Sequence, residues 1–157
     1  MRNLECRVCS GKGKVVINLH KQPLANALTK KDQTQKSFPL KVFRCFSCST
    51  LQLVGNINPK ILFNNYVWVT GTSKSTINYL KTFSEIILKK YKTRKVKILE
   101  IASNDGTFLK ILKKNFNFVR GVEPAKNLAR LANKNGNKTF NYFFIEKNAK
   151  KIKKKIE

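Results

Sequence analysis

The pattern of apolar and polar positions changes near residue 70 of the chain. Residues 1–55 contain short apolar runs at 15–19, 40–43 and 51–54, separated by turn residues, which is typical of short strands. After Ser75 the apolar side chains recur every three or four residues, at Ile77, Leu80, Phe83, Ile87 and Tyr91. This spacing predicts a helix of about five turns with Ser75 or Thr76 as its N-cap.

The second half of the chain alternates strand and helix patterns. Apolar, β-rich runs at 96–102, 118–123 and 139–145 enclose two helical patterns, the second of which ends at Gly136. The lysine-rich end keeps Ala149, Ile152 and Ile156 at helical spacing, which indicates a helix with a solvated face. Strands alternating with helices predict a parallel sheet, and three such strands are half of a doubly wound fold.

The sequence therefore predicts an α/β protein with two parts. A small β-rich module occupies residues 1–55, a connector with aromatic anchors occupies 56–74, and the first half of a Rossmann-like domain occupies 75–157. A hydrophobic content of 41% is enough to build a core. No apolar run approaches the ~18 residues of a membrane span and no signal sequence follows Met1, so we expect a cytoplasmic protein without structural disulfides.

The charge of the chain suggests a polyanionic partner, but it has a second explanation. Lys and Arg number 33 against 8 Asp and Glu, a net charge of +25. The excess lies in 27 Lys accompanied by 17 Asn, whereas Gly numbers 7 and Pro 4. Lys and Asn have AT-rich codons, so base composition can raise both without selection for phosphate binding. The charge alone therefore does not define the function.

Two C-x-x-C pairs contain every cysteine of the chain: Cys6 with Cys9, and Cys45 with Cys48. Four thiolates complete a tetrahedral, closed and therefore structural zinc site. Closing the 35-residue loop between the pairs costs only ~3 kcal/mol, against ~10–16 kcal/mol from structural zinc. Arg7 and Arg44 can offset the charge of the tetrathiolate, and His20 is not needed as a ligand. A redox dithiol and buried free thiols are the alternatives.

The scarce acidic residues gather in one region. Glu100, Asp105 and Glu123 fall within 24 residues, at or just after the ends of the first two predicted parallel strands, where such folds bind ligands. An acid that ends the second strand can bind a ribose diol. The loop EIASNDGTFL has one glycine, Gly106, which does not suit a pyrophosphate. A ligand with a carboxylate and an amine, S-adenosylmethionine, suits this loop better.

The motifs taken in order resemble a known family. They are C-x-x-C, QPLAN (22–26), FPLKVFRCFSCSTLQL (38–53), LFNNYVW (62–68), EIASNDGTFL, GVEPAKNLA (121–129) and FF (143–144). This order resembles the zinc-binding, S-adenosylmethionine-dependent C-methyltransferases that act on nucleotide-linked deoxysugars. The resemblance runs over nearly the whole chain. Small departures are His20, where the family tends to have a small residue, and Trp68, where it tends to have Tyr.

The resemblance implies a role for most of the candidate site residues. The zinc ligands would be Cys6, Cys9, Cys45 and Cys48. The S-adenosylmethionine site would comprise Glu100, Ser103, Asn104, Asp105, Gly106, Glu123 and Pro124. Tyr66 matches an aromatic residue that could cover the cofactor or the substrate, with packing between domains as the alternative. The implied reaction removes a proton next to a keto group, after which the enolate attacks the sulfonium methyl.

The general base of that reaction has no counterpart in this chain, because the family takes it from a His beside an acid further along and the only histidine is His20. We therefore expect a truncated or split methyltransferase, or a remnant of one, whose sole candidate catalytic residue is Tyr66. A second chain that completes the sheet is a further candidate partner, besides the nucleotide-linked sugar. The alternative hypothesis is a nucleic-acid-binding zinc module with a non-catalytic α/β scaffold, but the three aromatic residues in 1–55 make a thin stacking platform.

Overall fold

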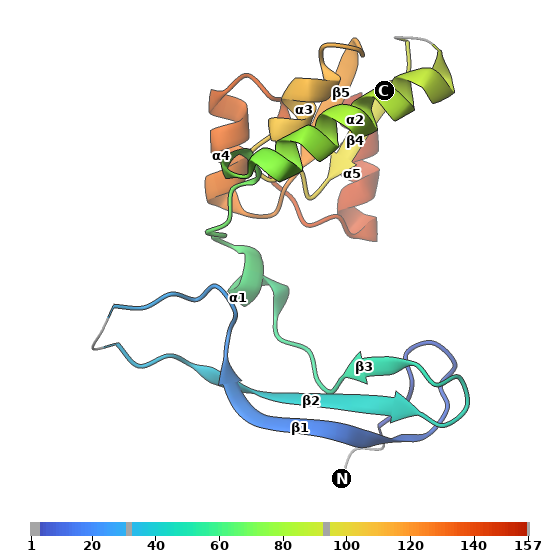
Figure 1. Ribbon diagram of the computed structural model, residues 1–157, viewed down its shortest axis with the longest axis vertical. Coiled ribbons are helices and arrows are strands. Elements are labelled where there is room, and N and C mark those ends of the chain that lie inside the picture. The colour runs from blue at the N-terminus through green and yellow to red at the C-terminus, as the bar shows by residue number, and fades with distance from the viewer. Residues whose placement is uncertain (1–3, 31–32, 93–94, 157) are drawn as a thin grey trace. The chain divides into compact units, whose positions relative to one another are not determined.

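A computed structural model describes residues 4–30, 33–92 and 95–156 of the chain (Figure 1). Its contacts divide it into two compact units, residues 1–62 and residues 63–157. Among the described helices, none combines the length and the apolar character needed to cross a bilayer.

The first unit contains a three-stranded antiparallel sheet in the order β1-β2-β3. The strands are β1 (Gly13–Pro23), β2 (Ser37–Cys45) and β3 (Leu51–Leu53), with β1 and β2 running side by side in Figure 1. The short helix α1 (Pro59–Phe63) ends this unit and enters the next. The start of β1 lies against the end of β2 so closely that a Cβ on Gly13 would be 2.1 Å from the carbonyl oxygen of Arg44. Glycine is required at this crossing because any side chain would collide with backbone.

The core of the first unit is very small. Cys6, Phe43 and Cys45 are buried, with Leu4 and Val54 packed against them. On β1, by contrast, Val15, Val16, Ile17 and Leu19 are 38–51% exposed. A unit of this size with one buried aromatic ring needs a further source of stability.

The second unit is a parallel α/β arrangement in the strand order β4-β5-β6. The strands are β4 (Lys97–Ile101), β5 (Phe118–Val122) and β6 (Thr139–Phe140). The helices are α2 (Lys74–Tyr91), α3 (Thr107–Leu112), α4 (Lys126–Lys134) and α5 (Glu146–Ile156), and a 3-10 turn, η1 (Thr70–Thr72), precedes α2. A core of Leu109, Leu112, Phe116 and Val119 packs against apolar side chains of α2 and β4. The predicted fold class is therefore confirmed.

Three boundaries differ from the prediction. The N-cap of α2 is Ser73, whose hydroxyl accepts from the Thr76 N–H, so the helix begins earlier than the apolar pattern alone indicated. The strand predicted at 139–145 covers only Thr139 and Phe140, because its continuation pairs with no neighbour in the described sheet. The connector contains the short elements α1 and η1, since Asn58 and Val69 accept the hydrogen bonds that start these turns.

Candidate functional site

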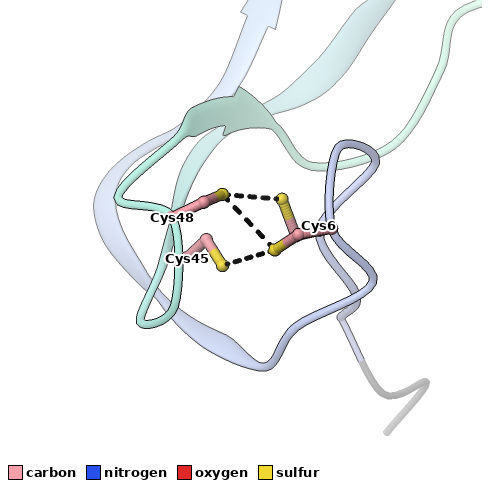
Figure 2. A group of neighbouring side chains, drawn as sticks. Cys6, Cys45 and Cys48 are labelled. Atoms are coloured by element: carbon pink, nitrogen blue, oxygen red, sulfur yellow. Dashed lines mark hydrogen bonds between the residues drawn. The ribbon is translucent and has the colours of Figure 1, made fainter.

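The four cysteine sulfurs of the first unit lie together (Figure 2), although 35 residues separate the two pairs. All four sulfur atoms are within 4.8 Å of one another. Cys6 Sγ is 3.6 Å from Cys48 Sγ, and Cys9 Sγ is 3.5 Å from Cys45 Sγ and 3.4 Å from Cys48 Sγ. The four thiols are free, and Cys6 and Cys45 are buried while Cys9 and Cys48 are exposed.

Tight turns present these sulfurs. In the first, the Cys6 N–H donates to Gly11 O, the Ser10 N–H donates to Cys6 O, and the Val8 N–H points at Cys6 Sγ at 3.4 Å. In the second, the Cys45 N–H donates to Thr50 O. Backbone N–H groups aimed at sulfur stabilise the thiolate form, which is the form that binds a metal.

The thiols of the cluster differ widely in acidity. The hydroxyl and backbone N–H of Thr50 lower the pKa of Cys48 to about 6. A backbone hydrogen bond from Gly11 lowers the pKa of Cys9, but the neighbouring Cys48 and Cys45 sulfurs outweigh it and raise the pKa to about 12. Four adjacent thiols cannot all ionise unaided, because the negative charge of each thiolate disfavours ionisation of the next thiol. A divalent cation between them would remove this opposition.

The geometry fits zinc. Sulfur ligands at about 2.3 Å from a tetrahedral zinc ion are separated by about 3.8 Å. Three of the observed separations are 3.4–3.6 Å, slightly below that value, and all are within 4.8 Å. Four sulfur donors in this arrangement form a zinc-binding cluster and leave no open coordination position.

The structure also places Arg7 and His20, which were considered beside the cysteines. The guanidinium of Arg7 donates to Leu53 O at 2.9 Å, Gly55 O at 3.3 Å and Asn56 Oδ1 at 2.9 Å. It thus ties the first C-x-x-C turn to the segment after β3. His20 is exposed on β1 with φ 57° and is not part of the sulfur cluster.

In the second unit, the loop between β4 and α3 has an unusual backbone. Ala102, Asn104 and Gly106 have φ of 59°, 51° and 78°, so every second residue is left-handed. Glycine adopts this conformation freely, asparagine tolerates it, and alanine does so at a cost. Only one of these three positions is a glycine, so the number of glycines in the sequence underestimates how tightly this loop turns.

Glu123, directly after β5, holds the loop in place. Its Oε2 accepts from the Asn104 N–H at 2.8 Å, and its Oε1 accepts from the Ala125 N–H at 2.7 Å. The Glu123 side chain is only 6% exposed. The carboxylate therefore joins the end of β4 to the start of α4, and each of its oxygens keeps a lone pair for a further donor.

Glu100 and Ser103 each carry a buried oxygen that lacks a partner among the residues that the structure describes: Glu100 Oε2 and Ser103 Oγ. Burial, together with the charges of Asp105 and Glu123, raises the pKa of Glu100 to about 8. Buried polar atoms are normally hydrogen-bonded, so unpaired ones at a strand end indicate a place where a ligand can supply the missing partner.

The side chains of Asn104 and Asp105 turn toward the segment before α2. Asn104 Oδ1 accepts from the Thr70 N–H at 3.0 Å, and Asn104 Nδ2 donates to Trp68 O at 3.2 Å. Asp105 Oδ2 accepts from the Gly71 N–H at 3.2 Å and from the Thr107 hydroxyl at 2.7 Å. These two side chains are engaged with backbone groups and the Thr107 hydroxyl, so a ligand at this loop would meet mainly its backbone.

The structure brings most of the predicted cofactor residues to one edge of the parallel sheet. Glu100, Asn104 and Glu123 converge there, and Pro124 continues from Glu123 with its carbonyl oxygen accepting from Asn141 Nδ2 at 2.9 Å. Tyr66 reaches the same edge through Asn127 on the first turn of α4. The sequence reasoning passed over Asn127, although it stands within the GVEPAKNLA motif.

Comparison with known protein families adds an independent finding. Residues 6–63 match a family described as "Putative zinc binding domain". All four cysteines lie within this range. The zinc-binding character of the first unit therefore has support from both family and geometry.

A longer similarity covers most of the chain. It is 32% identical over 140 residues to the C-methyltransferase NovU of Streptomyces niveus, which is 86% of this chain and 33% of that protein. The chain thus spans about a third of the length of this relative. Together the two findings confirm the resemblance drawn from the motifs, which is to the N-terminal part of the zinc-binding C-methyltransferases.

Proposed function

We propose that this chain is the zinc-binding and methyl-donor-binding part of an S-adenosylmethionine-dependent C-methyltransferase. One zinc ion held by Cys6, Cys9, Cys45 and Cys48 stabilises the first unit, and S-adenosylmethionine binds at the carboxyl edge of the β4-β5-β6 sheet. The similarity to a C-methyltransferase supports the reaction type. The methyl acceptor is a carbon of a nucleotide-linked keto-deoxysugar.

The observation that carries the cofactor proposal is the buried Glu100 Oε2 at the end of β4, which has no hydrogen-bond partner among the described residues. It lies close enough to Glu123 and Asp105 for their charges to raise its pKa. Neighbouring carboxyl groups oppose one another's ionisation, so a positively charged group beside them would be favourable. The amino group of S-adenosylmethionine supplies a positive charge and hydrogen-bond donors.

Each residue at this edge has a separate task in the proposed site. The bound cofactor supplies a methyl group on a positively charged sulfur. Glu100 binds the amino group, and the left-handed turn through Ser103, Asn104, Asp105 and Gly106 brings backbone close to the cofactor. Glu123 uses the remaining lone pairs of its oxygens for the ribose hydroxyls, with Pro124 beside it. None of these groups removes a proton from the acceptor.

The general base and the rest of the sheet are therefore proposed to come from protein outside these 157 residues, either a continuation or a second chain. β4 lies at one edge of the described sheet, with β5 as its neighbour. An edge strand offers unpaired backbone groups to a further strand. Tyr66 is a candidate to cover the cofactor or the acceptor. We place the protein in the cytoplasm, where the four thiols stay reduced for zinc.

The nucleic-acid alternative finds little support in the aromatic residues of the first unit. Phe43 is fully buried, Phe38 is partly buried and Phe46 is 64% exposed. A single exposed ring does not form a platform for successive bases.

Titration of S-adenosylhomocysteine into the zinc-loaded chain tests the proposed cofactor site by calorimetry. We expect a dissociation constant below 1 mM for the wild type, on the order of ordinary metabolite affinities. Glu100→Gln preserves the shape of the side chain but cannot bind an amino group as a carboxylate, so it should weaken binding about tenfold.

Glu85→Gln is the matched control, because Glu85 is exposed on α2 and makes the same chemical change away from the site. It should leave the affinity unchanged. Absence of heat at millimolar ligand with the wild type, or equal losses in the two variants, would contradict the cofactor assignment.

A further inference from the structure

Residues 64–71, which lead into α2 and include the first two residues of η1, follow the carboxyl edge of the sheet without a partner strand among the described residues. None of their apolar side chains is fully buried, since Val67 is 59% exposed, Trp68 is 44% exposed, and Tyr66 and Val69 are only partly buried. Segments that are not anchored by buried side chains usually move, so another interaction must fix this one.

Two asparagine side chains supply that interaction. Asn127 Oδ1 accepts from the Tyr66 N–H at 3.1 Å and Asn127 Nδ2 donates to Tyr66 O at 2.8 Å. One amide thus satisfies both backbone groups of Tyr66, as a neighbouring strand would. Next to it, the Lys126 N–H donates to Asn64 O at 3.0 Å.

Asn104 binds the same segment four residues further on. Its Oδ1 accepts from the Thr70 N–H at 3.0 Å and its Nδ2 donates to Trp68 O at 3.2 Å. Asp105 adds a bond from the Gly71 N–H at 3.2 Å. A Cβ on Gly71 would be 2.8 Å from both Asp105 Oδ2 and Thr107 Oγ1, so the contact leaves no room for a side chain.

The two asparagines stand on the two elements from which the proposed cofactor site is built. Asn104 lies in the loop after β4, and its own N–H donates to Glu123 Oε2. Asn127 lies on the first turn of α4, four residues after Glu123. Residues 64–71 therefore bridge the ends of β4 and β5, and the hydrogen bonds run without a break from Glu123 through Asn104 to this segment.

We propose that Asn127 and Asn104 are positioning residues that hold residues 64–71 as a fixed wall of the methyl-donor site, so that they govern ligand affinity through this segment. The inference rests on the proposed function, because it takes the ligand that contacts this wall to be an S-adenosyl compound. Asn127 acts without touching that ligand. Its side-chain amide holds the backbone of Tyr66 in place, and through Tyr66 it holds the rest of residues 64–71.

Trp68 is the only tryptophan of the chain and lies on the wall itself, so its fluorescence reports the segment directly. Asn127→Ala removes both bonds to Tyr66. We expect acrylamide quenching of Trp68 to increase about twofold and the dissociation constant of S-adenosylhomocysteine to rise about five- to tenfold, as expected for the loss of one or two hydrogen bonds. Asn104→Gly, which keeps the left-handed backbone, should give the same quenching change.

Asn133→Ala is the matched control. Asn133 also lies on α4, and its amide binds Ala129 O and Thr139 O at 2.7 and 2.8 Å, away from residues 64–71. It should lower the unfolding temperature but leave Trp68 quenching and ligand affinity as in the wild type.

Unchanged Trp68 quenching in Asn127→Ala would overturn the inference, as would equal losses of affinity in Asn127→Ala and Asn133→Ala. A wild-type chain that binds no S-adenosylhomocysteine would contradict the proposed function and the assigned ligand. Trp68 quenching in the ligand-free variants would still test whether the two asparagines hold residues 64–71 in place.

Discussion

The two units of this chain obtain their stability in different ways. The first has three buried core residues, two of which are cysteines, and its longest strand is exposed along most of its length. The second buries apolar side chains from β5, α3, α4 and α5 and adds a carboxylate that binds two backbone N–H groups. From this comparison we expect the first unit to depend on a bound metal for its stability, whereas the second relies on packing.

The sharpest way to break this comparison is to remove a zinc ligand. Cys45→Ser should abolish zinc binding, which we expect at about one ion per chain, and unfold the first unit, because structural zinc contributes about 10–16 kcal/mol. The helices of the second unit should remain. Metal analysis and circular dichroism at 222 nm check the two parts separately.

Ser47→Ala, in the same turn but with no sulfur to offer, is the control and should retain zinc. Folding of the first unit in the zinc-free Cys45→Ser chain, seen as preserved amide signals of β1 and β2, would show that the metal is not what stabilises it.

A second, smaller effect is expected in the other unit. Glu123→Ala leaves the buried N–H groups of Asn104 and Ala125 without their acceptor, and each buried donor without a partner costs about 1–3 kcal/mol. The free energy of unfolding of the second unit should fall by about 2–6 kcal/mol. Urea denaturation followed by circular dichroism measures this loss.

Zinc content in Glu123→Ala should stay as in the wild type, since the change lies outside the sulfur cluster. A simultaneous loss of zinc would mean that the two units do not draw on separate sources of stability.

The pH dependence of stability separates the units further. Glu100 ionises near its ordinary value of 4.5 in the unfolded chain but near 8 when folded. Between these values the folded chain holds one proton more, so its stability decreases as the pH rises from about 4.5 and levels off above about 8.

For Glu100 we expect a loss on the order of 1–3 kcal/mol across that range, after allowance for partial solvent access. Glu100→Gln removes the titrating group and should flatten this part of the curve. Denaturant midpoints measured from pH 5 to pH 9 provide the check, with Glu85→Gln as control. An unchanged slope in Glu100→Gln would show that Glu100 is not the group responsible.

The smallest expected effect concerns backbone strain in the loop after β4. Ala102→Gly should stabilise the second unit by up to about 1 kcal/mol, because glycine adopts the left-handed φ of 59° without steric cost. Gly106→Ala should do the opposite, since φ is 78° there and a Cβ would lie 2.9 Å from Asn137 Cβ. Thermal unfolding measures both, and a destabilised Ala102→Gly would contradict the strain at this position.

Much of the architecture follows from local patterns. The period of three to four residues in 77–91 predicted α2, and the alternation of apolar runs with helices predicted the parallel sheet. Boundaries were less predictable, as at β6, because the apolar run 139–145 is equally compatible with a strand and with packing outside a sheet. The length of a strand depends on its pairing with neighbouring strands, and the periodicity of the sequence carries no information about that pairing.

The candidate sites show the same division. The C-x-x-C spacing predicted the sulfur cluster, because such a turn brings two thiolates together whatever surrounds it. The predicted cofactor residues also gather at one sheet edge. Their individual interactions were not predictable: Asn104 binds Trp68 and Thr70, and Asn127 binds Tyr66. These contacts join residues 34 to 61 positions apart.

The sequence by itself determined the type of each unit, the four sulfur donors and the acids at the strand ends, because residue type and local spacing carry that information. The tertiary structure alone decided which hydrogen bonds these residues make. Glu123 became the group that joins two strand ends, Glu100 acquired a raised pKa, and residues 64–71 were bound by two amides. Burial and long-range contact set these properties, and both arise only when distant segments meet.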